Sequence, residues 1–329
     1  MSISEFSLIE RYFTSLEQQP NGVALGIGDD CALLEVPDGY QLAVSIDTLV
    51  EGVHFLPGTP AEHIASRVFG ACLSDLAAMG AEPAWITLAL TIPRASEDWL
   101  EGFSRALSQK MTTFNVTLVG GDTTRGHLTI SMQVHGWVPK GQALQRNTAK
   151  INDYVFVSGT LGDSAAGLDQ LKTGSDKTAE HRLDKKNNQR DYLIQRFQHP
   201  EPRISTGLAI RTFASAAIDI SDGLLADLGH ILEQSKVGAT IEEDLLPISN
   251  ALAENYDQQQ VQRWALTGGE DFELCFCIPE IQMESFQQAL EGHPVKLTCI
   301  GQLTKQQGII LKSRNGKTKP VAAQGYEHF

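Results

Sequence analysis

Acidic residues that follow glycines or apolar runs are the strongest chemical signal in this sequence of 329 residues. A helix cap or a turn explains any single acid of this kind, but the pattern recurs along the chain. Carboxylates and hydroxyls are hard oxygen ligands that Mg²⁺ prefers, and Mg²⁺ usually shares its shell with substrate phosphates. The acids therefore predict a magnesium-dependent phosphate site. They are Asp29, Asp30, Asp47, Asp75, Asp122, Asp219, Asp222, Glu270 and Asp271.

The overall charge narrows the choice of partners. The chain has 40 acidic and 26 basic side chains, a formal net charge of -14, which argues against nucleic acid and against an anionic membrane surface. The same charge repels phosphates unless the acids hold metal ions that in turn hold the phosphates. No stretch reaches the roughly 18 apolar residues of a membrane span. We therefore expect no nucleic-acid partner and no membrane.

The cysteines and the first residues indicate a compartment. The five cysteines are odd in number and form no C-x-x-C pair, so neither a disulfide framework nor a structural zinc site is expected. Cys275 and Cys277 alternate in an apolar run, 274–278, which is typical of a buried strand. The opening residues lack the basic and apolar regions of a secretory signal. These features predict a cytoplasmic protein.

Better-known catalytic and phosphate-binding motifs do not occur. Gly316-Lys317-Thr318 is the nearest match to a Walker A loop, but Leu311 stands where a glycine is required. Gly26-Ile27-Gly28 begins like a dinucleotide fingerprint, yet Cys31 occupies the third glycine position. The kinase motifs H-R-D and D-F-G, the zinc motif H-E-x-x-H and the G-x-S-x-G elbow are absent. The sequence alone does not decide whether a Ser/His/Asp triad is present.

Hydrophobic periodicity predicts two α/β halves. Apolar residues every fourth position from Ile64 to Leu76 predict a helix between Thr59 and Gly80. Pro139–Gly141 is a turn-like break and the candidate domain boundary. The polar segment Lys172–Asp191 is expected to be a solvated loop or helix without a catalytic role. Further helices are expected at 6–16 and 97–114, and strands at 42–46, 85–92, 117–119, 128–138 and 154–157.

One spacing occurs twice. Ser74-Asp75 precedes Gly120-Gly121-Asp122, and Ser221-Asp222 precedes Gly268-Gly269-Glu270 at nearly the same distance. This echo predicts two halves built on one structural plan.

Six motifs, in order along the chain, resemble those of the bacterial thiamine-monophosphate kinase family, which is related to aminoimidazole ribonucleotide synthetase and selenophosphate synthetase. Their order and spacing agree from Phe6 to Phe329, essentially the whole chain, which makes the resemblance specific. The motifs are GIGDDCA at 26–32, SIDTLVEGVHF at 45–55, LSDLAAMGA at 73–81, GGDTT at 120–124, DISDG at 219–223 and GGED at 268–271.

The resemblance implies an α/β (α+β) fold of two domains. An N-terminal mixed-sheet domain, residues 1–140, would bind ATP and Mg²⁺ and form a homodimer. A C-terminal α/β domain, residues 141–329, would complete the nucleotide and substrate site, so that both halves contribute acidic turns. The implied reaction is phosphorylation of thiamine monophosphate by ATP to thiamine diphosphate, the last step of thiamine diphosphate biosynthesis. Several Mg²⁺ ions would assist in-line transfer of the γ-phosphoryl group, mainly by positioning and charge neutralisation.

The resemblance also assigns roles to residues. Ile46 stands where we expect threonine, so only its backbone carbonyl could serve as a ligand. The guanidinium of Arg146 suits bidentate phosphate binding, Glu270 could accept a bond from the aminopyrimidine, and Tyr326 could stack on a thiamine ring. The implied metal ligands are Asp30, Ser45, Ile46, Asp47, Asp75, Asp122, Asp219 and Asp222. The implied ATP contacts are Gly121, Asp122, Arg146 and Ser221, the acceptor contacts are His54, Glu270 and Tyr326, and the catalytic acids are Asp47, Asp122 and Asp222.

The sequence allows two other interpretations. The first is another ATP-dependent synthetase of the superfamily. A selenophosphate synthetase would need a reactive residue in an N-terminal glycine-rich loop, but Cys31 follows the acids instead. The second is a non-catalytic scaffold or metal-binding protein. It predicts that some ligands are lost, but every proposed ligand position is filled. Asp29 and Asp271 are expected to be capping or supporting groups.

Overall fold

The computed structural model describes residues 11–13, 22–173 and 185–326. Contacts divide the chain into two compact units, Met1–Leu76 with Ala81–Gln142, and Ala77–Gly80 with Ala143–Phe329. Most of the helix expected at 6–16 lies outside the described residues. Within the described ranges, no helix is both long and apolar enough to cross a membrane.

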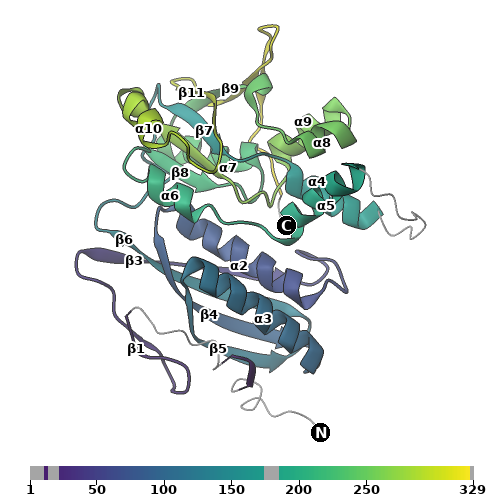
Figure 1. Ribbon diagram of the computed structural model, residues 1–329. Helices are drawn as coiled ribbons and strands as arrows, with labels where there is room; N and C mark the ends of the chain where they lie inside the picture. The colour runs from purple at the N-terminus through teal and green to yellow at the C-terminus, as the bar shows by residue number, and fades with distance from the viewer. Residues whose placement is uncertain (1–10, 14–21, 174–184, 327–329) are drawn as a thin grey trace. The chain divides into compact units, whose positions relative to one another are not determined.

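The first unit is built on a mixed sheet. In the described residues its strand order is β3-β6-β4-β5, antiparallel except for the parallel pair β4–β5. Helices α2 and α3 lie side by side across one face of this sheet (Figure 1), where Phe69 and Phe114 place their ring centroids 5.6 Å apart. The elements are β1 (Val23–Leu25), β2 (Leu33–Leu34), β3 (Tyr40–Val50), α2 (Ala61–Ala78), β4 (Glu82–Ile92), α3 (Glu97–Phe114), β5 (Thr117–Arg125) and β6 (Thr129–Pro139).

The two faces of this sheet differ in burial because side chains alternate along a strand. On β6, Ile130, Met132 and Val134 are fully buried under the helices, while their neighbours are only half-buried. The predicted apolar stripe of α2, from Ile64 to Leu76, is buried against that face. The helix expected between Thr59 and Gly80 is therefore confirmed, and among the described residues of the first unit no helix covers the opposite face of the sheet.

The second unit holds a larger mixed sheet, with the strand order β13-β12-β9-β11-β7-β10-β8. Pairing is antiparallel except between β12 and β9. Part of the polar segment 172–191 forms the start of helix α5, and 174–184 lies outside the described residues. The strands are β7 (Tyr154–Ser158), β8 (Ala216–Asp219), β9 (Gly238–Glu242), β10 (Leu274–Ile278), β11 (Leu297–Thr304), β12 (Gly308–Lys312) and β13 (Thr318–Val321). The helices are α4 (Asp163–Thr173), α5 (Lys185–Gln198), α6 (Ile204–Ile210), α7 (Leu224–Ser235), α8 (Asn250–Asn255), α9 (Gln258–Thr267) and α10 (Met283–Ala289).

Strand β10 lies between β7 and β8 in the second sheet. All five of its residues are buried, which confirms the strand predicted from the alternation of Cys275 and Cys277. Burial raises the pKa of both thiols, so these cysteines act as small apolar side chains. Their place in the core is shared with Leu224, Leu228 and Ile231 of α7.

The predicted duplication is wrong. Asp75 lies in the last turns of helix α2, whereas Asp222 lies in a turn before helix α7. Gly120–Asp122 belongs to strand β5, whereas Gly268–Glu270 belongs to the loop between α9 and β10. Short glycine–acid motifs recur here in unlike elements, and the two sheets have different strand orders.

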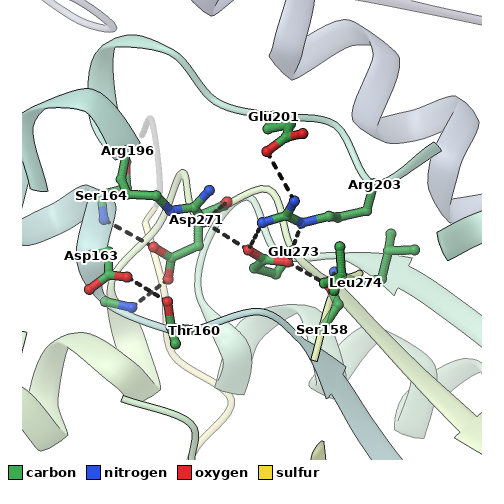
Figure 2. Close-up of polar contacts among 12 residues, drawn as sticks. Ser158, Thr160, Asp163, Ser164, Arg196, Glu201, Arg203, Asp271, Glu273 and Leu274 are labelled. Carbon is green, nitrogen blue, oxygen red and sulfur yellow. Dashed lines mark hydrogen bonds and ion pairs between the residues drawn. The ribbon is translucent and has the colours of Figure 1, made fainter. Parts of the chain in front are cut away.

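A buried ion cluster ties β10 to two helical segments. Glu273 is fully buried, and Arg203 grips both its oxygens, with Nε to Oε2 and Nη2 to Oε1 at 2.6 Å each. Arg196 adds a bond to Oε1 at 2.8 Å and Ser158 one to Oε2 at 2.6 Å (Figure 2). Although burial raises the pKa of Glu273, the two arginines lower it below its ordinary value.

Glu273→Ala should strongly destabilise the protein. The substitution leaves Arg196 and Arg203 largely buried without their carboxylate, so we expect the free energy of unfolding to fall by about 3–5 kcal/mol. Urea denaturation measures the loss. Glu201→Ala is the matched control, because Glu201 is an exposed partner of the same Arg203, at 3.3 Å, and should contribute about 0–1 kcal/mol. Equal losses in the two variants would contradict this account.

Candidate active site

One face of β3 carries two of the predicted metal ligands. Ser45 and Asp47 are two residues apart, so both side chains point to the face that α2 covers. Asp75 of α2 meets them there, since Ser45 Oγ donates to Asp75 Oδ2 at 2.5 Å. Ile46 points to the opposite face, where its side chain is 59% exposed. The structure thus gathers Ser45, Asp47 and Asp75 and turns the Ile46 side chain away from them.

This group suits a divalent cation. Burial and the charge of Asp75 raise the pKa of Asp47 to about 6, although a hydrogen bond with Cys72 lowers it in part. A cation would relieve both effects, and the oxygen donors are those that Mg²⁺ prefers. In the part of the chain that the structure describes, no three His, Cys, Asp or Glu side chains gather closely enough to hold a metal alone. The residues fit an ion that completes its shell with phosphates and water.

A β-bulge aims the next motif into a cavity. Ile86 of β4 pairs with Leu118 of β5, but Thr87 pairs with Gly120, so Val119 is inserted between them. Bulges re-aim side chains and are common beside active sites. The segment after the bulge lines a cavity of about 600 Å³, a size typical of small-molecule sites, about 300–1,000 Å³. The lining residues are Phe13, Ile27, Gly28, Asp29, Asp30, Cys31, Ala32, Leu88, Leu118, Val119, Gly120, Gly121, Asp122 and Thr123.

The turn after β1 brings Asp30 to the same cavity. Gly28 has a φ of +119°, a conformation that favours glycine. The N–H of Asp30 then donates to Oδ1 of Asp29 at 2.8 Å, so Asp29 supports the turn as expected. The structure therefore places Asp30, Gly121 and Asp122 around one cavity.

A tight turn after β3 holds His54. The N–H of Val50 donates to Nδ1 of its ring at 3.1 Å, so a neutral ring carries its proton on Nε2. Arg67 of α2, which is 2% exposed, donates from Nη2 to the His54 carbonyl at 2.9 Å. Ring and backbone are both fixed, and the ring nitrogen that carries the proton is a suitable donor for an anionic phosphate.

In the second unit, the turn 220–223 joins β8 to α7. Asp219 ends β8 and is buried. The N–H groups of residues 221, 222 and 223 all donate to one atom, Oδ2 of Asp227, each at 3.0 Å. Burial raises the pKa of Asp227 to about 7, an effect that these backbone donors oppose. The turn that carries Ser221 and Asp222 is therefore organised around a buried carboxyl group.

The loop after α9 is bound to this turn. The N–H of Glu270 donates to the carbonyl of residue 221 at 2.7 Å, and that of Phe272 to the carbonyl of residue 220 at 2.9 Å. Glu270 and Phe272 have φ values of +66° and +50°, a conformation that costs non-glycine residues about 1–3 kcal/mol. Between them, Asp271 accepts bonds from the N–H groups of Gly162 and Ser164 at the start of α4, which confirms its capping role.

The C-terminal segment reaches the same turn. The N–H of Tyr326 donates to the Asp222 carbonyl at 3.1 Å. Gly325 passes so close that an added Cβ would lie 2.4 Å from that carbonyl oxygen. The Tyr326 side chain is 52% exposed. Four predicted site residues of the second unit, Ser221, Asp222, Glu270 and Tyr326, therefore meet at one turn.

Arg146 lies elsewhere in the second unit. Its carbonyl accepts a bond from the hydroxyl of Ser235 at 2.9 Å, and Ser235 is the last residue of α7. The turn that carries Ser221 precedes the first residue of this 12-residue helix, which is about 18 Å long at 1.5 Å per residue. The backbones of these two predicted ATP contacts are thus held at opposite ends of α7.

Comparison with known proteins identifies the family. Residues 28–138 match the family model for the N-terminal domain of AIR synthase related protein, and residues 150–313 match that for its C-terminal domain. Thiamine-monophosphate kinase of Escherichia coli K12 is 48% identical over 333 residues, covering 100% of this chain and 99% of that protein. This chain belongs to the thiamine-monophosphate kinase family.

Solved structures of thiamine-monophosphate kinases have the same fold. The crystal structure from Stenotrophomonas maltophilia K279a aligns with a TM-score of 0.85 and 44% identity, covering 96% of this chain and 98% of the other. AaThiL complexed with AMPPCP and TMP aligns with a TM-score of 0.77 and 31% identity, covering 100% and 99%. The resemblance drawn from six motifs and the predicted mixed α/β fold are both confirmed.

Sequence reasoning missed the side chains that hold the kinase-family motifs in place. Asp227 stands five residues after Asp222, in the first turn of a helix, where an acid commonly bonds to backbone N–H groups. Arg67 precedes Val68 on the apolar stripe of α2, where a buried arginine needs a specific partner. Both signals were present in the sequence, but neither reveals its partner.

Gly121→Ala should weaken nucleotide binding in this kinase-family chain. A Cβ at Gly121 would lie 2.0 Å from the backbone oxygen of Leu88, which cannot move without opening the β4–β5 pairing. We expect affinity for AMPPCP to fall at least about tenfold, since small displacements of binding groups have large effects; calorimetry measures it. Gly120→Ala is the neighbouring control, because its Cβ would meet only the Thr87 methyl at 4.0 Å. Equal affinities in the two variants would refute the steric argument.

Proposed function

We propose that this chain catalyses the phosphorylation of thiamine monophosphate by ATP, giving thiamine diphosphate and ADP. The full-length similarity to Escherichia coli thiamine-monophosphate kinase, 48% identical, carries the proposal. A relative solved with AMPPCP and TMP supports both substrates. The product would be the finished diphosphate, so we place the reaction last in thiamine diphosphate biosynthesis.

The reaction joins two anions. An oxygen of the acceptor phosphate forms a bond to the γ-phosphorus, and the bond from that phosphorus to the β,γ-bridging oxygen breaks in line with it. The acceptor oxygen is already ionised, so the chain need not supply a strong base. Two unit charges 4 Å apart repel by roughly 4 kcal/mol at an effective dielectric constant of 20. Positioning and charge neutralisation are therefore the main catalytic tasks.

Mg²⁺ fits the acids of this chain. When bound, several ions would supply the positive charge that offsets repulsion between the phosphates of ATP and acceptor. The mixed donor set of Ser45, Asp47 and Asp75, with the raised pKa of Asp47, supports this assignment. We propose Asp47, Asp122 and Asp222 as the acids that turnover needs. The full set of proposed ligands is Asp30, Ser45, the carbonyl of Ile46, Asp47, Asp75, Asp122, Asp219 and Asp222.

We assign ATP to the cavity at the β5 bulge. Gly121 presents backbone without a side chain there, which lets phosphates approach closely, and Asp122 stands beside it. Arg146 and Ser221 complete the proposed ATP contacts. We assign ATP and magnesium binding, with dimerisation, to a first domain, residues 1–140. The second domain, residues 141–329, completes the nucleotide and substrate contacts.

Three residues are proposed to bind the acceptor. The fixed ring of His54 offers a donor to the monophosphate. Glu270, held at a positive φ, can accept a bond from the aminopyrimidine of thiamine. Tyr326 is half exposed, and the face of its ring can attract the thiazolium cation.

Purified protein with ATP, Mg²⁺ and thiamine monophosphate should release ADP and thiamine diphosphate in equal amounts, measured by chromatography. Asp122→Asn removes a proposed ligand charge and should abolish turnover while the circular dichroism spectrum stays unchanged. Glu284→Gln, an acid on α10 outside the proposed site, is the control and should retain activity.

Absence of product at millimolar Mg²⁺ would sink the proposed function. Free thiamine tests the acceptor, because it lacks the phosphate that the site is proposed to hold. Comparable phosphorylation of free thiamine would refute an acceptor phosphate bound through metal.

The uncovered face of β3 supports a homodimer. Leu42, Val44 and Ile46 are 46%, 49% and 59% exposed, in a row on the side opposite Ser45 and Asp47. A contiguous apolar strip on an exposed sheet face marks an interaction surface. We propose that two copies of the chain cover this face mutually.

Leu42→Glu should convert the proposed homodimer to monomers, because it places a charge in the centre of an apolar contact. Sedimentation velocity measures the mass of the particle. Ile281→Glu is the control, since Ile281 is 89% exposed in the second unit and should not affect assembly. A wild-type monomer, or a dimer unaffected by Leu42→Glu, would exclude an interface on this face.

A cytoplasmic location follows from the proposed chemistry. The reaction uses ATP, which is available in that compartment. All five cysteines are free thiols, the state that a reducing compartment maintains.

A further inference from the structure

We propose that Asp227 is a positioning residue that sets the geometry of the second unit's contacts to nucleotide, metal and acceptor. It acts through the turn 220–223, which carries Ser221 and Asp222. The proposal rests on the proposed function, because that function gives these contacts their roles. Asp227 itself is 2% exposed and lies below the turn, on the first turn of α7.

Three consecutive peptide groups converge on Asp227. The N–H groups of residues 221, 222 and 223 each donate to its Oδ2 at 3.0 Å. Residues 221 and 222 precede α7 and Gly223 is its N-cap, so these N–H groups have no partner inside the helix, and an unsatisfied buried donor is strongly unfavourable. A single side-chain oxygen therefore satisfies all three.

Each of these peptide groups also holds another segment. In a trans peptide the N–H and the preceding C=O point in opposite directions, so an N–H directed at Asp227 directs its carbonyl outward. The outward carbonyls of residues 220, 221 and 222 accept bonds from the N–H groups of Phe272, Glu270 and Tyr326, at 2.9, 2.7 and 3.1 Å. Three rigid peptide planes thus link the carboxylate of Asp227 to the Glu270 loop and to the C-terminal segment.

The close packing around the turn limits how it can move if the carboxylate is lost. Gly223 has a φ of +118°, and a Cβ there would lie 2.8 Å from the backbone of Thr267. A Cβ at Gly269 would lie 2.6 Å from the Ser221 carbonyl oxygen. Without Asp227 the peptide planes rotate rather than translate, which turns the carbonyls away from Glu270 and Tyr326.

Substitutions at Asp227 test this role. Asp227→Ala removes the acceptor, and we expect KM for ATP and for thiamine monophosphate each to rise about tenfold and kcat to fall about 100-fold. Asp227→Asn keeps an acceptor oxygen at the same reach and should recover most of both losses. Asp153→Ala is the control, because Asp153 is another buried acid of the second unit, bonded to Lys150 and Ser215, and should leave both KM values unchanged.

Hydrogen exchange of the protein without substrates provides a second readout. The amides of residues 221–223 and of residues 270 and 326 should exchange much faster than in the wild type in Asp227→Ala, and to a smaller but measurable extent faster in Asp227→Asn. Asp153→Ala should not change them. Because this measurement needs no turnover, it stays decisive even if the wild type fails to phosphorylate thiamine monophosphate.

Unchanged KM values with unchanged exchange at residues 270 and 326 would overturn the proposal. So would equal effects of Asp227→Ala and Asp153→Ala, which would mark Asp227 as a purely structural acid. If Asp227→Ala does not fold, Asp227→Asn carries the test. Its weaker, uncharged acceptor should still speed exchange at residues 221–223, and wild-type exchange there would refute the role.

Discussion

A carboxylate removed from water must find hydrogen-bond donors, and this constraint organises the second unit. Asp227 takes three backbone donors from the turn before α7, and Asp271 takes two from the start of α4. Glu273 takes two arginines and a hydroxyl. The residues proposed to touch substrates, Ser221 and Glu270, stand beside these satisfied acids, so their backbones are fixed before any ligand arrives.

Other acids of the chain lie beside another carboxylate or at an exposed cavity. Asp47 and Asp75 are brought together although their charges repel, and burial together with this repulsion raises the pKa of Asp47 to about 6. Asp30 and Asp122 are exposed at a cavity. The formal charge of -14 therefore includes two kinds of acid. Some accept hydrogen bonds from donors of the protein itself, and others lie where a bound cation would balance their charge. The latter suit a site where phosphates arrive together with magnesium.

Local pattern predicted much of this fold, because helix and strand periodicity is written in neighbouring residues. Helix 97–114 has the predicted bounds, and β10 is the buried strand expected from its alternating cysteines. The β5 bulge, the Asp227 bonds and the position of Arg146 were not predictable, since each depends on residues distant in sequence. The predicted duplication was wrong for a related reason. One serine–aspartate pair lies at the end of a helix and the other in a turn before a helix, and the short motif does not distinguish these two positions.

The cysteines differ sharply in accessibility. Cys72, Cys275 and Cys277 are buried with raised pKa values, and burial also raises the pKa of the half-buried Cys299. Cys31 is exposed and lines the cavity assigned to ATP. Because a thiol must be reachable to react, a maleimide dye will label the exposed Cys31 first. The native chain thus carries a ready attachment point for a fluorescent reporter of nucleotide occupancy.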